Sequence, residues 1–313
     1  MIPIPRPAAV LLLAALAAAC GKRETLHTLE RIPLPDTVTA GATLALDSLN
    51  RAWIGQAGRL TAVDTAGHVR ARIPVALEGT PHLLWLGGGR IYARTAQAAT
   101  VIDEKSLKPG GVRRSEAPLA RDPRGRWVFT ASRTGSVMGL DTASLAVRWG
   151  WPDAGSRVSA LAVSPLGDRV YVALAGSGRN DVPSSIEVRD ALSGRLLSAY
   201  ETSGAASRLE VAPDGTLYAL IGGEVVALRH GREGLVPRWR KGFGGIGRGE
   251  PDELRVSPSG ARVAVLARGR ELRLLAAADG KVLEESKQSP RDVAWDAAGR
   301  LWVLGAREIR IAR

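Results

Sequence analysis

The sequence predicts an all-β fold, a seven-bladed β-propeller whose amino-terminal strand completes the last blade. The first observation is a unit of apolar strand, tight turn and second apolar strand that recurs seven times along the 313 residues. The second is the spacing of these units, 36 to 48 residues, because a four-stranded propeller blade takes ~40–45 residues. The third is composition: 36 glycines and 18 prolines favour many turns over long helices.

The turn at the centre of each unit is the clearest landmark of the repeat. Residues 160–172 show the pattern, an apolar strand that runs into a turn and then a strand rich in valine and tyrosine. Six of the seven turns end on glycine and one on asparagine, residues that tolerate a positive backbone φ. These landmarks are Asn50, Gly89, Gly125, Gly167, Gly215, Gly260 and Gly299.

The second half of each unit predicts a third and a fourth strand. The third strand ends in a polar turn, as at residues 64–67 and 190–194, and residues 69–75 are typical of the fourth strand. The last unit stops after its third strand, at residues 308–313. Residues 25–35 precede the first unit and resemble residues 69–75, so we expect them to close the ring as the fourth strand of blade 7.

The amino terminus has the pattern of an export signal rather than of the fold. Residues 8–19 are apolar and end in small residues, and Arg6 is the only charge before them. This run is too short to cross a bilayer comfortably, since a spanning helix needs ~20 apolar residues. The predicted organisation is a signal peptide at 1–20, a linker at 21–24 and one propeller domain at 25–313.

The signal ends in Leu-Ala-Ala-Ala-Cys-Gly at residues 16–21, which resembles the lipobox of bacterial lipoproteins. The resemblance implies that the Cys20 thiol is acylated and anchors the protein in the bacterial cell envelope, although Ala17 replaces the more usual leucine. The alternative is a plain signal peptide cleaved after Ala19, which would leave Cys20 as a free thiol. Cys20 is the single cysteine of the chain, and its position favours lipidation.

Cysteine usage and charge exclude several classes of protein. One cysteine excludes a disulfide framework, and no C-x-x-C-H motif is present to attach a c-type haem. The net charge is +12, from 37 arginines and 6 lysines against 31 acids, but the basic residues are scattered. Because neither a basic helix nor a basic stripe flanked by aromatic residues is present, we expect no nucleic-acid partner. We expect a monomer.

Motifs of enzymes and metal sites are weak in this sequence. Residues 242–247 match the pattern G-x-G-x-x-G. The dinucleotide-binding fingerprint needs a helix after the glycines, however, and Pro251 follows too closely for one. We interpret them as a loop between blades 5 and 6; the alternative is an anion held by its amides with Lys241 and Arg248. The four histidines fall at unlike positions of different blades, so we expect no metal site and no cofactor, although acidic ligands stay open. They are His27, His68, His82 and His230.

The eight tryptophans divide into two groups by their place in the repeat. Five lie in first or second strands, where a large ring fills the wedge between blades, and we expect them to pack there. They are Trp53, Trp85, Trp127, Trp295 and Trp302. Three others lie in or just past fourth strands, and one interpretation makes them part of a partner surface. They are Trp149, Trp151 and Trp239.

The repeat resembles the seven-bladed propeller superfamily of YVTN and WD40-like repeats, most clearly at residues 161–172 and 186–194. The resemblance covers residues 25–313. It departs from the family pattern at Leu166, where the turn usually has aspartate, and at residues 87–89, where three glycines replace the turn. It implies a rigid disc for binding but no single activity, since the fold hosts scaffolds, lactonases, lyases and quinone enzymes.

Alignment of the seven first strands predicts which side chains lie at the mouth of the central channel. The positions seven and five residues before each landmark point to one side, and charge there is confined to blades 5, 6 and 7. Neighbouring blades are expected to pair Arg208 with Glu253 and Glu210 with Arg255. One interpretation is an ion-pair network that closes the channel; the other is a polar ligand site, with Thr43 and His82 completing the rim. The candidate residues are Thr43, His82, Arg208, Glu210, Glu253, Arg255 and Asp292.

A second candidate recognition element is the long loop at residues 175–185 of blade 4, with Arg179, Asn180 and Asp181. The alternative is a tolerated insertion. The sequence thus predicts a lipid-anchored, non-catalytic binding or assembly module outside the cytoplasm, with a protein or a small polar ligand of the envelope as partner. The rival prediction is an envelope enzyme of the propeller type, a lactonase or a quinone-dependent oxidoreductase, with its site at the channel mouth.

Overall fold

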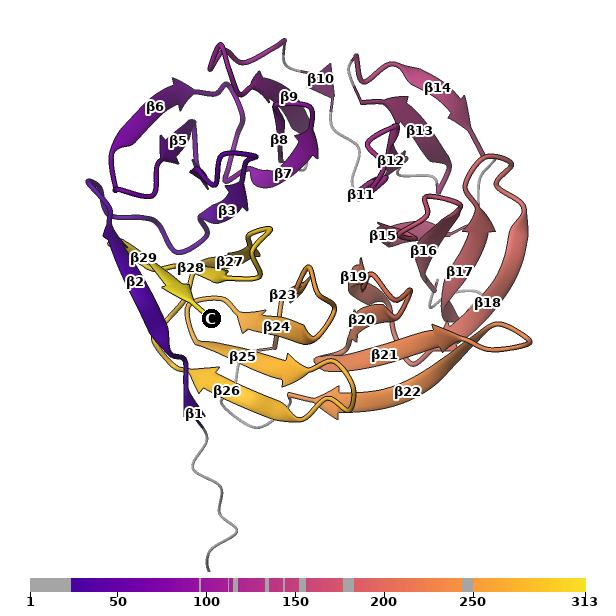
Figure 1. The fold of residues 1–313 in the computed structure, drawn as a ribbon. Helices are drawn as coiled ribbons and strands as arrows, with labels where there is room; N and C mark the ends of the chain where they lie inside the picture. The colour runs from indigo at the N-terminus through magenta and orange to yellow at the C-terminus, as the bar shows by residue number, and fades with distance from the viewer. Residues whose placement is uncertain are drawn as a thin grey trace, which may run out of the picture.

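Seven antiparallel sheets surround a central axis, as the ring in Figure 1 shows. The computed structural model describes residues 24–95, 97–111, 113–114, 118–132, 135–142, 144–151, 156–176, 183–243 and 250–313. In these residues every regular element is a strand, and each sheet supplies one blade. The predicted fold class, an all-β propeller of seven four-stranded blades, is confirmed.

Each blade runs from an innermost first strand to an outermost fourth strand. Blade 1 consists of β3 (Thr43–Leu46), β4 (Ala52–Gln56), β5 (Arg59–Val63) and β6 (Val69–Pro74). Blade 2 consists of β7 (His82–Gly87), β8 (Arg90–Arg94), β9 (Ala98–Asp103) and β10 (Arg113–Arg114). Blade 3 consists of β11 (Leu119–Arg121), β12 (Trp127–Ala131), β13 (Val137–Asp141) and β14 (Val147–Gly150). Blade 4 consists of β15 (Arg157–Val163), β16 (Arg169–Ala175), β17 (Ser184–Asp190) and β18 (Leu196–Thr202).

The last three blades contain the carboxyl-terminal half and both ends of the described chain. Blade 5 consists of β19 (Ala206–Val211), β20 (Leu217–Ile221), β21 (Glu224–His230) and β22 (Leu235–Gly242). Blade 6 consists of β23 (Glu253–Val256), β24 (Arg262–Ala267), β25 (Glu271–Ala276) and β26 (Val282–Ser286), with β1 (Glu24–Thr25) added at its outer edge. Blade 7 consists of β27 (Asp292–Trp295), β28 (Leu301–Leu304), β29 (Glu308–Ala312) and β2 (Thr28–Pro33).

Burial follows the position of a strand within its blade. All five residues of β4 and of β20 are buried, because both faces of a second strand are covered by neighbouring blades. Fourth strands are mostly exposed or half-buried, as in β18. The core is therefore a set of apolar layers between adjacent blades rather than one central mass.

The landmark turns have the backbone conformation that their sequences indicate. Asn50 has φ 55° and Gly167 φ 65°, and the other five landmark glycines also have positive φ. Gly167 carries a second constraint, since a Cβ there would collide with Asp122 and Arg126 of blade 3. In blade 2, Gly87 and Gly88 share this conformation with Gly89, which explains a turn made of three glycines.

The ring is closed by the two ends of the described chain. β2 pairs antiparallel with β29, with Ile32 opposite Ile309 and Arg31 opposite Arg310. Ile32 is 1% exposed and belongs to the apolar layer between blades 7 and 1. The predicted completion of blade 7 by the amino-terminal strand is confirmed.

The amino-terminal segment also pairs with blade 6, which the sequence did not indicate. Glu24 and Thr25, at the border of the predicted linker, pair parallel with Glu284 and Glu285 on the outer strand of blade 6. Strand pairing is made by backbone groups, which every residue carries, so the sequence pattern does not indicate it. The segment therefore bridges blades 6 and 7 along the rim.

The tryptophans pack between blades. Trp53 and Trp302 are fully buried, and their indole N–H groups donate to Asp47 Oδ2 at 2.8 Å and Asp296 Oδ2 at 3.0 Å. The interpretation of the outer tryptophans as a partner surface is wrong for Trp151, which is buried, while Trp149 and Trp239 are half-buried. Trp151 is 4% exposed and stacks on Trp149, and Trp239 donates to the carbonyl of Ala277 in the next blade.

Among the described residues, no helix has the length and hydropathy that crossing a bilayer requires.

Closure of the ring through β2 predicts different effects for two of its side chains, Ile32 and Leu29. Ile32→Ala should lower the free energy of unfolding by about 2–5 kcal/mol, because it leaves a cavity in the blade 7 layer. Leu29→Ala is the matched control, since Leu29 is 50% exposed, and should change it by less than ~0.5 kcal/mol. Urea unfolding followed by tryptophan fluorescence measures both. Equal losses in the two variants would contradict closure through β2.

Candidate binding site at the channel mouth

Four of the seven predicted residues line an open cavity in the central channel. His82, Arg208, Glu210 and Arg255 lie in the wall of a space of about 1020 Å³. The other three do not line it, and all three are buried. They are Thr43, Glu253 and Asp292.

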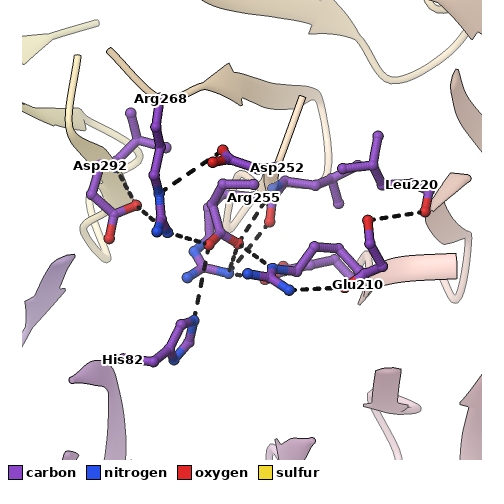
Figure 2. Close-up of polar contacts among 12 residues, drawn as sticks. His82, Glu210, Leu220, Asp252, Arg255, Arg268 and Asp292 are labelled. Atoms are coloured by element: carbon purple, nitrogen blue, oxygen red, sulfur yellow. Dashed lines mark hydrogen bonds and ion pairs between the residues drawn. The ribbon is translucent and has the colours of Figure 1, made fainter. Parts of the chain in front are cut away.

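Glu253, at the start of β23, forms ion pairs with Arg255 and Arg268, which Figure 2 labels. Its side chain is 0% exposed, and three guanidinium groups contact its carboxylate. Oε1 lies 2.9 Å from Arg255 and 3.2 Å from Arg208, while Oε2 lies 2.9 Å from Arg268. His82 Nε2 approaches Oε2 at 3.9 Å from blade 2, across the ring.

Both ion pairs expected between neighbouring blades are present. Arg208 of β19 donates to Glu253 at 3.2 Å, and Arg255 of β23 donates to Glu210 of β19 at 3.2 Å. The aligned positions of adjacent first strands lie at matching heights, so each base meets the acid of its neighbour. The pairs form a network between blades 5 and 6, but the network leaves the channel open beside it.

Thr43 and Asp292 face neighbouring blades instead of the rim. Asp292 Oδ2 accepts a hydrogen bond of 2.7 Å from the backbone N–H of Leu44 in blade 1. The Thr43 hydroxyl donates to the carbonyl of Pro81, just before blade 2. The expectation that Thr43 completes the rim is therefore wrong, and both side chains join one blade to the next.

Arg268 is the residue of the ion-pair network that the sequence reasoning missed. It follows β24, the second strand of blade 6, and lies 3.8 Å from Asp292 and 3.9 Å from Asp252 besides its contact with Glu253. The alignment considered first strands only. A signal was available in the register, because Glu253 opposes Leu266 and a residue two places further has its side chain on the same face.

Burial and mutual charge shift the pKa values of the acids in opposite directions. Burial alone would raise the pKa of Glu253, but Arg255, Arg208 and other cations bring it below its ordinary value. Burial and the charge of Glu253 raise the pKa of Asp292, and burial raises that of Glu210. Glu253 is therefore the ionised partner for the surrounding guanidiniums.

His82 lies at the edge of the cavity with its side chain 30% exposed. Burial lowers the pKa of His82 to about 3; the charge of Glu253 opposes this shift, and the nearby arginines add to it. The imidazole is neutral at pH 7, so one ring nitrogen donates and the other accepts.

The rest of the cavity wall comes from blades 2 to 5 and includes residues that the sequence did not single out. Arg94, Arg121 and Arg157 line it together with apolar side chains such as Leu161 and Leu209. The channel thus has two sides, a buried ion-pair network on blade 6 and an open basic wall opposite.

Three predicted elements lie outside the described residues. They are the acylation site Cys20, the loop residues Arg179, Asn180 and Asp181, and most of the glycine-rich segment that ends at Arg248. In the part of the chain that the structure describes, no three His, Cys, Asp or Glu side chains are placed to hold a metal ion.

The network makes a prediction about Glu253. Glu253→Gln leaves three guanidiniums without their counter-charge and should lower the free energy of unfolding by about 3–5 kcal/mol at pH 7. Because the pKa of Glu253 is lowered in the folded state, its contribution is present above the ordinary value of 4.5 and is lost as the pH falls. The difference between wild type and variant should therefore narrow below pH 4.5.

Urea unfolding at a series of pH values measures this difference. Glu233→Gln is the control, since Glu233 is exposed in the turn between β21 and β22 and should change stability little at any pH. A constant difference between wild type and the Glu253 variant from pH 7 to pH 3 would contradict the network.

Comparison with known proteins supports the fold and does not show a family. No protein-family model matches the sequence, and no curated protein matches it. Among solved structures, a chain of hydrazine synthase from Kuenenia stuttgartiensis superposes with a TM-score of 0.69 at 15% identity, over 89% of this chain and 97% of that one.

Two further solved structures have similar propellers. A chain of the mitotic checkpoint complex gives a TM-score of 0.69 at 12% identity, over 100% of this chain and 97% of that one. The Cps50 (Swd1) β-propeller domain of Myceliophteria thermophila gives 0.71 at 14% identity, over 88% and 98%. At these identities the likeness concerns the fold alone: a seven-bladed β-propeller with WD40-like structural neighbours.

Proposed function

We propose that this protein is a lipid-anchored, extracytoplasmic β-propeller of the bacterial cell envelope that acts as a non-catalytic binding or assembly module. One observation carries the proposal. Among the described residues that line the open cavity, the one carboxylate, Glu210, is paired with Arg255, and the neighbouring Glu253 is fully buried among guanidiniums, whereas five arginines face the cavity. Guanidinium groups stay protonated, so they bind anions and hydrogen-bond acceptors but do not transfer protons.

Similar propellers among solved structures support an assembly role. One similar propeller is a chain of a mitotic checkpoint complex, and another is the β-propeller domain of Cps50 (Swd1); these two chains are covered over 97% and 98% of their length. A rigid disc offers two faces and a rim for such contacts. We propose a protein or a small polar ligand of the envelope as the partner.

The proposed anchor rests on the lipobox resemblance at Cys20. β1 begins at Glu24, four residues later, at the outer edge of blade 6 (Figure 1). Four extended residues span at most ~14 Å, so a lipid on Cys20 would hold the rim near the membrane. In that arrangement both ends of the central channel stay accessible to partners.

A second function is favoured by one feature, the neutral imidazole of His82 in the wall of a large cavity. Histidine is the commonest general base of enzymes, although the lowered pKa of His82 makes it a weak base. The rival proposal is therefore an envelope enzyme of the propeller type, a lactonase or a quinone-dependent oxidoreductase, acting at the channel mouth.

The anchor is tested by Cys20→Ala in a bacterium with intact lipoprotein processing. Wild type should fractionate with membranes and incorporate labelled fatty acid, whereas the variant should be soluble and unlabelled, because acyl chains supply the membrane affinity. His27→Ala, an exposed change that keeps Cys20, should behave as wild type. Membrane retention of the Cys20 variant at the wild-type level would contradict the anchor.

Binding and catalysis are separated by His82→Ala, compared with His68→Ala, whose side chain is 70% exposed. For a binding module whose partner contacts the mouth, the His82 variant should keep the wild-type melting temperature and retain less of the partner captured from envelope extract. The His68 variant should capture as wild type does. Turnover of a lactone or quinone substrate by wild type, abolished in the His82 variant, would favour the enzyme instead.

A further inference from the structure

The central cavity is lined by an excess of positive charge. Five arginines contribute to the wall of this space of about 1020 Å³, and Glu210 is the one carboxylate among the described residues that line it. The five are Arg94, Arg121, Arg157, Arg208 and Arg255. The net charge of +12 is spread over the whole chain, so it does not by itself explain why five arginines and one carboxylate line a single cavity.

Three of the five arginines are held by contacts within the protein. Arg255 contacts both Glu210 and Glu253, and Arg208 contacts Glu253. Arg121 lies over the ring of Trp85, with its guanidinium carbon 4.9 Å from the ring centroid. The single lining carboxylate is therefore already engaged by Arg255.

The other two arginines form no ion pair within the described part of the chain. Arg94 ends β8 directly opposite His82 in the register and is only partly exposed. Arg157 begins β15 and is exposed to the channel. Burial lowers the pKa of Arg94, Tyr92 opposes this shift, and the nearby charge of Arg208 adds to it. A partly buried cation without a counter-charge is costly, and a bound anion would remove that cost.

The geometry of the mouth brings these cations to one end of the channel. His82, Arg157 and Arg208 stand at or near the starts of first strands, while Arg94 stands at the end of a second strand, which is the same end. Arg94 and Arg208 are close enough to affect each other electrostatically. An oxyanion at this end would meet guanidiniums from blades 2 and 5 and the neutral imidazole of His82.

The remainder of the wall is largely apolar. Leu84, Leu119, Leu161 and Leu209 line it, together with alanines and prolines. Ligand sites typically combine a mostly apolar wall with a few charged groups, in cavities of ~300–1,000 Å³. The space is therefore matched to a small molecule with an anionic end and an apolar body.

We propose that the central channel binds a small organic anion, whose carboxylate or phosphate group is held by Arg94 and Arg208, with Arg157 at the entrance, and whose apolar body packs against the leucines of blades 2 to 5. This inference rests on the proposed binding function and names the class of ligand. Guanidinium groups bind both kinds of oxyanion in bidentate geometry. The body of the ligand distinguishes it from a simple ion.

Isothermal titration of the full-length, detergent-solubilised protein at constant ionic strength tests the proposal. The probes are phenyl phosphate, benzoate and inorganic phosphate, with benzylamine as the cationic counterpart. Phenyl phosphate should bind one site saturably and at least ~10-fold more tightly than inorganic phosphate, because its ring buries apolar surface. Benzylamine should not bind. Tighter binding of phenyl phosphate than of benzoate assigns a phosphate ligand, and the reverse order assigns a carboxylate.

Arg94→Gln should weaken the better probe at least ~10-fold. Arg232→Gln, the same change in charge in the exposed turn between β21 and β22, should leave binding unchanged. Arg157→Gln, at an exposed position, is a second variant for the case that Arg94→Gln does not give the wild-type circular dichroism spectrum. It should weaken binding of the probe ~3-fold or more. Affinity that falls equally in the Arg232 variant, or binding with no difference between the two phosphates, overturns the proposal. Partner capture that persists without anion binding would remove this inference and leave the proposed function standing.

Discussion

The pairing of β2 with β29 is the constraint on which the rest of the structure depends. A propeller blade has an apolar layer on both faces, so every blade needs two neighbours, and only a closed ring supplies them. The chain ends one strand short of a full blade 7, and β2 provides that strand from the opposite terminus. With the ring closed, blade 1 packs on blade 7, and the layer that contains Ile32 and Trp302 is excluded from water.

Closure also sets the distances that create the charged network. First strands of neighbouring blades lie beside one another around the axis, so side chains at equal heights meet across the gap. Glu253 receives Arg208 from blade 5 and Arg268 from its own blade, while Asp292 reaches the backbone of blade 1. These carboxylates are buried because they act between blades, and burial favours a raised pKa in both. The surrounding guanidiniums nevertheless bring the pKa of Glu253 below its ordinary value, whereas the charge of Glu253 adds to the raised pKa of Asp292.

The asymmetry of the channel connects this network with function. On blade 6 the acids and bases neutralise one another inside the protein, whereas blades 2 to 5 present Arg94 and Arg157 to an open space. A cavity whose nearby carboxylates are already paired, and whose wall still presents guanidinium groups, is suited to hold an anion. The lining carboxylate Glu210 is paired with Arg255, and this arrangement supports the proposed binding role.

The sequence by itself determined the fold: seven turn landmarks, the missing last strand, and the segment that replaces it are all visible as local patterns. It also determined the pairs Arg208 with Glu253 and Glu210 with Arg255, because a strand register fixes the height and face of a side chain. Only the tertiary structure decided that Asp292 and Thr43 turn toward neighbouring blades, that Arg268 joins Glu253 from a second strand, and that β1 continues onto blade 6. The register along one strand carries no information about contacts across the gap between blades or about backbone pairing with a strand of another blade, because both depend on how the seven blades pack into one ring.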